Sequence, residues 1–161
     1  MRTKPISGPS PDRISKRRIA EMQLYRAIKL LEGEGPDYGP LSALTLAGAA
    51  EEILGKMAAA KGMPTAFEDA TDAAKQLRKF VRSLMGKKPG KPPKDGTIRR
   101  RLNRVRNAVK HNDPGRNSYV TAYFYLEAED MIRRGIRNYK KLYRKPPPQN
   151  EVQEWWDQMC D

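Results

Sequence analysis

The chain has 161 residues, of which 38% are hydrophobic, 32% charged and 7% aromatic, and its formal net charge is +13. This length suits one compact domain, and the balance is typical of a solvated helical protein rather than a membrane-spanning one. The longest uncharged run, residues 38–50, is too short and too rich in Gly, Ser and Thr to cross a bilayer, and no apolar signal segment follows the basic N-terminus. We therefore expect a cytoplasmic protein that does not engage a membrane.

The N-terminal part of the chain predicts a tail followed by one helix. Residues 1–12 combine three prolines with Gly and Ser and show no apolar period, which is typical of a disordered tail. From Ile14 onward apolar residues recur at helical spacing as far as Leu31, and Gly33 and Pro36 then end the pattern. We take residues 13–145 as the helical domain.

Two further helices are expected in the next 50 residues or so. An Ala- and Leu-rich segment begins just after Pro40 and ends at Gly62, and because it is apolar over most of its circumference we expect it to be the central, most buried helix. Thr65 and Glu68 then match the capping box, in which each side chain satisfies the other residue's backbone amide. The third helix should run from there to about Met85.

Residues 86–96 contain three prolines, three glycines and several lysines, so they predict a flexible linker within the domain. A fourth helix should start near Thr97 and end at the breaker of residues 112–115. A long fifth helix, residues 118–143, should carry basic residues on its outer face, and residues 146–161 should form a tail with a short helix that packs tryptophans on the bundle. No strand pattern occurs, so we expect an all-α bundle of four to five main helices plus a short C-terminal helix.

The chemistry available to the chain is narrow, because it has one histidine, His111, and one cysteine, Cys160. One His with one Cys cannot form a zinc site and a lone Cys cannot form an internal disulfide, so we expect neither metal nor cofactor. His111 is the one side chain whose ordinary pKa suits acid–base catalysis near neutral pH.

Positive charge is concentrated around this histidine. Residues 87–116 contain eleven Lys or Arg residues and two acidic residues, a net charge of +9. The basic charge of the chain favours a polyanionic partner such as RNA, DNA or an anionic membrane, and of these we expect RNA. The candidate nucleic-acid-binding residues are Arg99, Arg100, Arg101, Arg104, Lys110 and Arg116. A solvated basic face would give the same pattern without any nucleic acid.

The stretch RNAVKH, from Arg106 to His111, resembles the signature of the HEPN superfamily (higher eukaryotes and prokaryotes nucleotide-binding). In that signature an Arg, often followed directly by a polar residue, precedes a His by a few positions in an all-helical domain. The resemblance implies a homodimer that brings two motifs to one cleft and, as in many members, a metal-independent ribonuclease of a toxin–antitoxin or other defence system. It also implies that Arg106 and His111 are catalytic and that Asn107 orients the histidine or the phosphate.

Acidic residues on the second helix support several HEPN sites, and Glu51 and Glu52 are the candidates here. On a helical wheel Glu51 falls among small apolar side chains, whereas Glu52 lies on a more polar strip. A buried Glu51 needs a partner, and we expect Arg106 to be that partner.

Three functions fit this sequence, the third being a small structural or regulatory subunit whose paired helices simply dimerise. In the first, the protein binds RNA and cleaves it without a metal ion, with a cognate antitoxin or another partner protein. In the second, it is a catalytically silent basic module that binds nucleic acid or a protein, His111 being an ordinary helix-end residue and Arg106 a structural cross-link to Glu51.

Overall fold

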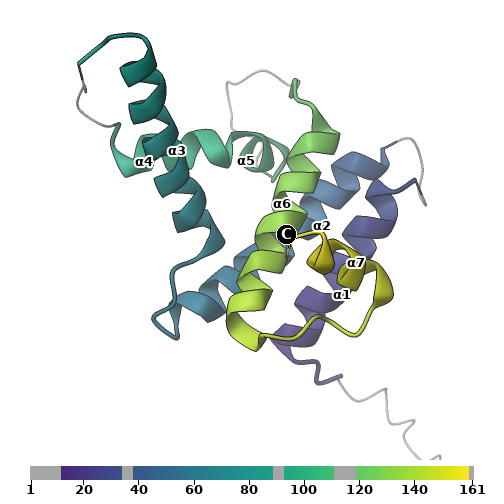
Figure 1. Ribbon diagram of the computed structural model, residues 1–161. Helices are drawn as coiled ribbons and strands as arrows, with labels where there is room; N and C mark the ends of the chain where they lie inside the picture. The colour runs from purple at the N-terminus through teal and green to yellow at the C-terminus, as the bar shows by residue number, and fades with distance from the viewer. Residues whose placement is uncertain (1–11, 34–37, 89–92, 111–118, 160–161) are drawn as a thin grey trace, which may run out of the picture.

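The computed structural model describes residues 12–33, 38–88, 93–110 and 119–159, and every regular element in these ranges is an α-helix (Figure 1). The helices are α1 (Lys16–Leu31), α2 (Gly39–Ala59), α3 (Ala66–Leu84), α4 (Asp95–Leu102), α5 (Arg104–Lys110), α6 (Phe124–Tyr143) and α7 (Asn150–Asp157). The expected all-α class is confirmed. The tail predicted for residues 1–12 lies outside the described residues, apart from Asp12.

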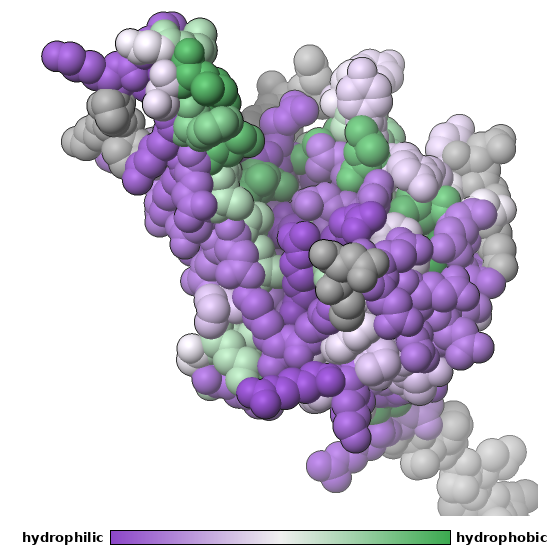
Figure 2. Space-filling model, in the orientation of Figure 1, coloured by the Kyte–Doolittle hydropathy of each residue, from purple (hydrophilic) through white to green (hydrophobic). Residues whose placement is uncertain are grey.

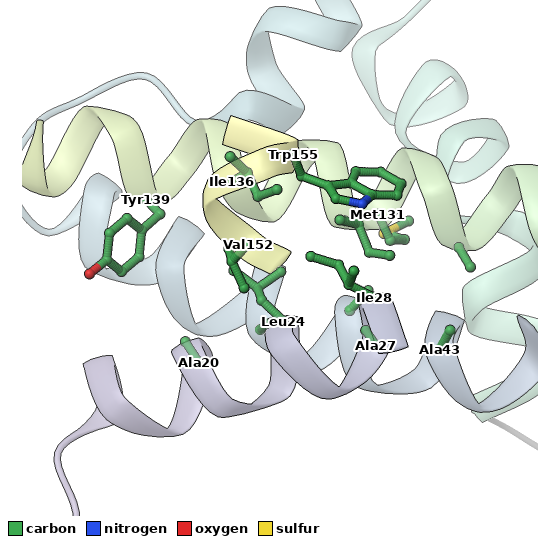
Figure 3. Close-up of a cluster of buried hydrophobic side chains, with 14 of the residues drawn as sticks. Ala20, Leu24, Ala27, Ile28, Ala43, Met131, Ile136, Tyr139, Val152 and Trp155 are labelled. Carbon is green, nitrogen blue, oxygen red and sulfur yellow. The ribbon is translucent and has the colours of Figure 1, made fainter. Parts of the chain in front are cut away.

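Helix α2 is the centre of the bundle, as its composition predicts, and packs most extensively on α6 and α1. Its small buried residues allow neighbouring helices to approach closely; they include Ala43, Ala47 and Ala50, and Gly48, which lies against Arg106 of α5. Figure 3 shows the core formed where the apolar sides of α1, α6 and α7 meet, with Leu24, Ile136 and Val152 together. Each such fully buried aliphatic side chain stabilises the fold by roughly 1.5–3 kcal/mol.

The predicted helix starts at α1, α2 and α3 agree with the capping seen. Ser15 precedes α1, and its hydroxyl oxygen accepts a hydrogen bond from the backbone N–H of Arg18 at 3.2 Å. Pro40 lies in the first turn of α2. At α3 the capping box is present in both directions: Thr65 Oγ1 accepts from the Glu68 N–H at 3.2 Å, and Glu68 Oε2 accepts from the Thr65 N–H at 2.7 Å.

Helix α3 is attached to the bundle at its N-terminal end. Asn138 on α6 is fully buried, and its Oδ1 accepts a hydrogen bond from the backbone N–H of Ala66 at 2.7 Å. Lys141, one turn further along α6, pairs with Asp69 at 2.5 Å. Beyond this attachment α3 extends away from the bundle, and α4 crosses beside it (Figure 1).

The prediction of one continuous fourth helix is wrong, because the chain forms two short helices separated at Asn103. Asn103 closes α4, and its Oδ1 accepts a hydrogen bond from the buried Arg134 at 3.2 Å. Asparagine is a poor helix former, and here its side chain bonds a distant residue of α6 at the point where the helix is interrupted. Helix α4 also starts earlier than expected, at Asp95 inside the predicted linker, where a carboxylate in the first turn suits the helix dipole.

The fifth predicted helix starts later than expected, at Phe124 rather than near Ser118. Residues 119–123 are not helical. This segment contains β-branched Val120 and Thr121 beside two tyrosines, and these residue types lose side-chain freedom in a helix. The fully buried residues of α6 begin at Ala128, whereas Val120 and Ala122 pack on the edge of the core without adopting helical geometry.

The C-terminal segment packs on the bundle as expected. Val152, Trp155 and Trp156 of α7 belong to the same buried cluster as α1 and α6, and the indole N–H of Trp155 donates to Glu32 Oε1 at 3.0 Å. Within the described residues, none of the helices combines the length and the apolar character that crossing a bilayer requires.

Candidate functional site

Arg106 reaches from α5 to two neighbouring carboxylates on α2. Its Nη2 donates to Glu52 Oε2 at 2.6 Å, and its Nη1 lies 3.6 Å from Glu51 Oε2. The arginine side chain is only 14% exposed, because the neighbouring Val105 is buried and holds α5 against the bundle. The expected pair of Glu51 and Arg106 is present, but Glu52 is the closer carboxylate.

A glycine on α2 makes room for this arginine. A Cβ added to Gly48 would lie 2.8 Å from Arg106 Nε and 3.1 Å from its Cδ. Real Cβ atoms essentially never lie within 3.0 Å of a neighbour, so a larger residue at position 48 would require the Arg106 side chain to shift while its guanidinium is bound to the carboxylates. Glycine inside a helix is ordinarily less stabilising than alanine, so a loss of stability on replacing Gly48 with alanine would reveal this contact.

Glu51 has a second cationic partner that the sequence analysis missed. Arg134 on α6 is 1% exposed, and its Nη2 lies 3.3 Å from Glu51 Oε1. The same nitrogen donates to Asn103 Oδ1, and Nη1 lies 3.5 Å from Asp130 Oδ2. Its guanidinium also lies over the ring of Phe67, 4.8 Å from the centroid. The expectation that this helix carries its basic residues on its outer face therefore does not hold for Arg134.

A signal for Arg134 is present in the sequence. On α6, Arg134 lies three residues after Met131 and four before Asn138, so helical spacing places it on the buried side. Glu51 occupies the corresponding place on α2, among small apolar residues. A charged residue on the apolar side of each of two helices predicts an ion pair, because an isolated buried charge is too costly.

Glu52 is the more exposed of the two carboxylates and contacts three cationic side chains. Lys56 donates to its Oε1 at 2.8 Å, Lys110 lies 3.7 Å from its Oε2, and Arg106 binds that same oxygen. The hydrogen bond from Lys56 and the charges of Lys110 and Arg106 lower the pKa of Glu52 to about 2, against the opposing effect of burial. Glu52 is therefore an anion over the whole physiological pH range.

A small pocket of about 160 Å³ opens beside this ion-pair cluster. Its lining combines apolar side chains of α2 and α5 with the charged groups, and consists of Leu44, Thr45, Ala49, Glu52, Arg106, Val109 and Lys110. Ordinary small-molecule pockets measure roughly 300–1,000 Å³. This pocket is too small for a whole nucleotide, but it is bordered by two cationic side chains that a phosphate oxygen could approach.

The remaining motif residues lie on or beyond α5. Asn107 is exposed, and because it follows Arg106 by one residue its side chain leaves the helix about 100° away from the arginine. Lys110 is 56% exposed and ends the helix. His111 and Arg116 lie outside the described residues.

The other predicted nucleic-acid-binding residues divide into two groups. Arg100, Arg101 and Arg104 are exposed on α4 and α5. Arg99 instead borders a larger hollow of about 610 Å³ between α3 and α4, where its Nη2 lies 3.9 Å from the carboxylate of Glu68. Its guanidinium carbon lies 5.5 Å from the ring centroid of Phe67. Arg99 thus has an acidic and an aromatic neighbour within the chain, and the other three arginines are better placed to meet phosphates.

No family model, curated protein or solved structure matches the chain. Its function therefore has to follow from the chemistry of the site itself. The cluster supplies a guanidinium held by two carboxylates and a second cation at Lys110. In the sequence, Lys110 is followed directly by the chain's one histidine, His111, which lies outside the described residues. Guanidinium and ammonium groups stabilise phosphate charge, and imidazole transfers protons near neutral pH.

Proposed function

We propose that this protein is a HEPN-like RNA-binding protein that cleaves RNA without a metal ion, through Arg106 and His111. The position of Arg106 carries the proposal. Two carboxylates of α2 hold its guanidinium at the edge of a small pocket. Lys110, the last residue of α5, also lines this pocket and directly precedes His111 in the sequence. An arginine fixed in this way needs no reordering when phosphate charge develops beside it.

RNA binding is assigned to the cationic outer side of α4 and α5. Arg100, Arg101 and Arg104 are exposed there, while Ile98 and Val105 are buried and anchor the two helices. Several cations on one short segment neutralise consecutive phosphates and release counterions, which gives strong but salt-sensitive binding. In this proposal the protein is a cytoplasmic homodimer, and a cognate antitoxin or another partner protein controls it.

The proposed reaction is an internal displacement at phosphorus. His111 removes the proton of a ribose 2′-hydroxyl, and the oxygen attacks the adjacent phosphorus while the bond to the 5′-oxygen breaks. Arg106 stabilises the charge on the phosphoryl oxygens, and Asn107 orients the phosphate. The 5′-oxygen leaves with a proton returned by an imidazolium or by water, so the products are a 2′,3′-cyclic phosphate and a 5′-hydroxyl.

The test is cleavage of labelled RNA by the purified protein in EDTA, compared with His111→Ala and Arg106→Lys. We expect the wild-type protein to cleave and both variants to bind RNA but lose activity. Thermal unfolding of each variant separates loss of chemistry from loss of fold. Cleavage that survives both substitutions would contradict the proposal, as would RNA binding by the wild type without cleavage.

One observation favours a second candidate, the catalytically silent binding module. Arg106 already has carboxylate partners in Glu52 at 2.6 Å and Glu51 at 3.6 Å, as a purely structural cross-link between α5 and α2 would have. In that function Arg106→Lys would lower stability, while RNA binding through Arg100, Arg101 and Arg104 would persist and no cleavage would occur at any stage. The same assay therefore decides between the two candidates.

A further inference from the structure

The C-terminal half of α3 exposes a strip of large apolar side chains. The strip consists of Leu77, Phe80, Val81, Leu84 and Met85, and Leu77 and Leu84 are 62% and 72% exposed. Figure 2 shows these hydrophobic residues as a continuous area along the part of α3 that projects from the bundle. Contiguous apolar surface of this kind on a soluble helix marks an interaction site more often than chance exposure does.

The strip lies on the same side of α3 as the residues through which the N-terminal half of this helix packs on the rest of the fold. Phe67, Ala70 and Ala74 are partly buried and lie at spacings of three and four residues, and Leu77, Val81 and Leu84 extend the same alternation. This is the spacing at which one helix packs against another in a coiled coil. The distal half of α3 is therefore built to receive a helix on the side that already faces the bundle.

Charge on this segment restricts the partner. Residues 73–94 contain eight Lys or Arg residues and no acidic residue. Helical spacing places Arg78 and Arg82 along one edge of the strip, within reach of the flanking positions of a packed helix. A second copy of α3 would bring the same cations against each other, and like charges at flanking positions oppose pairing. A helix with acidic flanking residues would pair with them.

We propose that the distal half of α3 is a docking surface for an acidic amphipathic helix of a different protein. The apolar side of that helix would cover Leu77, Val81 and Leu84, and its carboxylates would meet Arg78 and Arg82. The strip lies on the side of α3 turned toward the bundle, so a single helix reaches it more readily than the flat surface of a membrane does. This surface is separate from the Arg106 cluster and does not depend on RNA cleavage.

The experiment measures binding of a labelled synthetic peptide to the full chain by fluorescence anisotropy. The peptide has three heptads, with Leu at the a and d positions and Glu at e and g; matched peptides carry Ser in place of Leu or Lys in place of Glu. We expect only the first peptide to bind well. The double variant Leu77→Gln with Leu84→Gln should lower the affinity for this peptide about tenfold or more. The double variant Arg78→Glu with Arg82→Glu should lower it by a similar factor.

The matched control variant, Gln76→Ala with Ser83→Ala, changes exposed polar residues on the flank of α3 away from Arg78 and outside the leucine line, and should bind as the wild type does. Because the substituted leucines are exposed, thermal unfolding should be unchanged in the leucine and control variants. Arg82 also donates hydrogen bonds to the backbone oxygen of Lys88 at 2.9 and 3.2 Å, so binding by the arginine variant is measured well below its own unfolding temperature. Equal binding of the acidic and basic peptides, or binding unaffected by the leucine substitutions, would overturn the proposal. Dimers that depend on Leu77 and Leu84, detected by light scattering, would also overturn it. So would a protein that sediments with phosphatidylserine vesicles but does not bind the acidic peptide.

Discussion

Arg134 on α6 and Glu51 on α2 form a buried ion pair, with 3.3 Å between Nη2 and Oε1 and neither side chain more than 7% exposed. Arg106 approaches the other oxygen of Glu51 from α5. One carboxylate thus joins three helices beside the candidate site. The position of Arg106 therefore depends on residues that lie deeper in the bundle than the motif itself.

Removing Arg134 should destabilise the protein strongly. Arg134→Met leaves Glu51 buried with only the more distant Arg106, and breaking a buried pair costs about 3 kcal/mol or more. The control is the adjacent Arg133→Met, whose partner Glu129 lies nearer the surface and whose loss should cost about 1 kcal/mol or less. Urea unfolding of both variants measures the difference. Equal losses would show that the buried pair does not hold α2 and α6 together.

Gly48→Ala should lower stability although the same change inside a helix ordinarily raises it. The new Cβ would lie 2.8 Å from Arg106 Nε and would push the guanidinium away from Glu52. Gly55→Ala is the control, because its Cβ would meet Asn138 Nδ2 at 3.4 Å, a much milder contact. We expect Gly55→Ala to be neutral or stabilising by up to about 1 kcal/mol and Gly48→Ala to be destabilising by about 1 kcal/mol. If thermal unfolding ranks the two variants in the opposite order, the close approach of Arg106 to α2 is incorrect.

Glu52 should make stability depend on pH in the acid range. Its pKa is about 2 in the folded protein and near 4.3 in an unfolded chain. The lowered value means that the carboxylate stabilises the fold, fully above about pH 5, and that this contribution is lost as the pH falls toward 2. With 36% of the side chain exposed, solvent screening reduces the effect to about 1 kcal/mol.

Glu52→Gln tests this pH dependence directly. Urea unfolding between about pH 5 and pH 2 should show a shallower decline in stability for the variant than for the wild type. Glu154→Gln, at an exposed position on α7, is the comparison for an ordinary surface carboxylate. Parallel declines in wild type and Glu52→Gln would be inconsistent with the lowered pKa.

RNA affinity should depend on the exposed arginines of α4 and α5. Arg100→Gln with Arg101→Gln should weaken binding of single-stranded RNA and lower the slope of log affinity against log salt by about 0.7 for each phosphate that the variant no longer neutralises. Arg26→Gln with Arg137→Gln makes the same change in net charge at exposed positions on α1 and α6. Identical salt slopes for the two double variants would place RNA binding elsewhere on the protein.

The main helices could be predicted because their signals are local. Apolar spacing identifies α1, α2 and α3, and the capping box at Thr65 and Glu68 gives the start of α3 to the residue. Because Glu51 falls on the buried side of α2, the sequence also predicts that it needs a cationic partner. These inferences use only residues within a few turns of one another.

The parts that could not be predicted depend on contacts between distant segments. Asn103 ends α4 where its side chain accepts a hydrogen bond from Arg134, more than 30 residues away. Arg106 binds Glu52 more closely than Glu51, and its side chain lies against Gly48 of α2. Neither effect is visible until the packing of α2, α5 and α6 is known.

The central claim is that a ribose 2′-hydroxyl is the nucleophile and His111 its base. The most direct measurement incubates the protein in EDTA with an end-labelled single-stranded RNA and with DNA of the same sequence, and identifies the product ends by mass spectrometry. We predict cleavage of RNA to 2′,3′-cyclic phosphate ends, DNA that is bound but intact, and no cleavage of either by His111→Ala. Cleaved DNA, RNA ends without cyclic phosphate, or full activity of His111→Ala would contradict it.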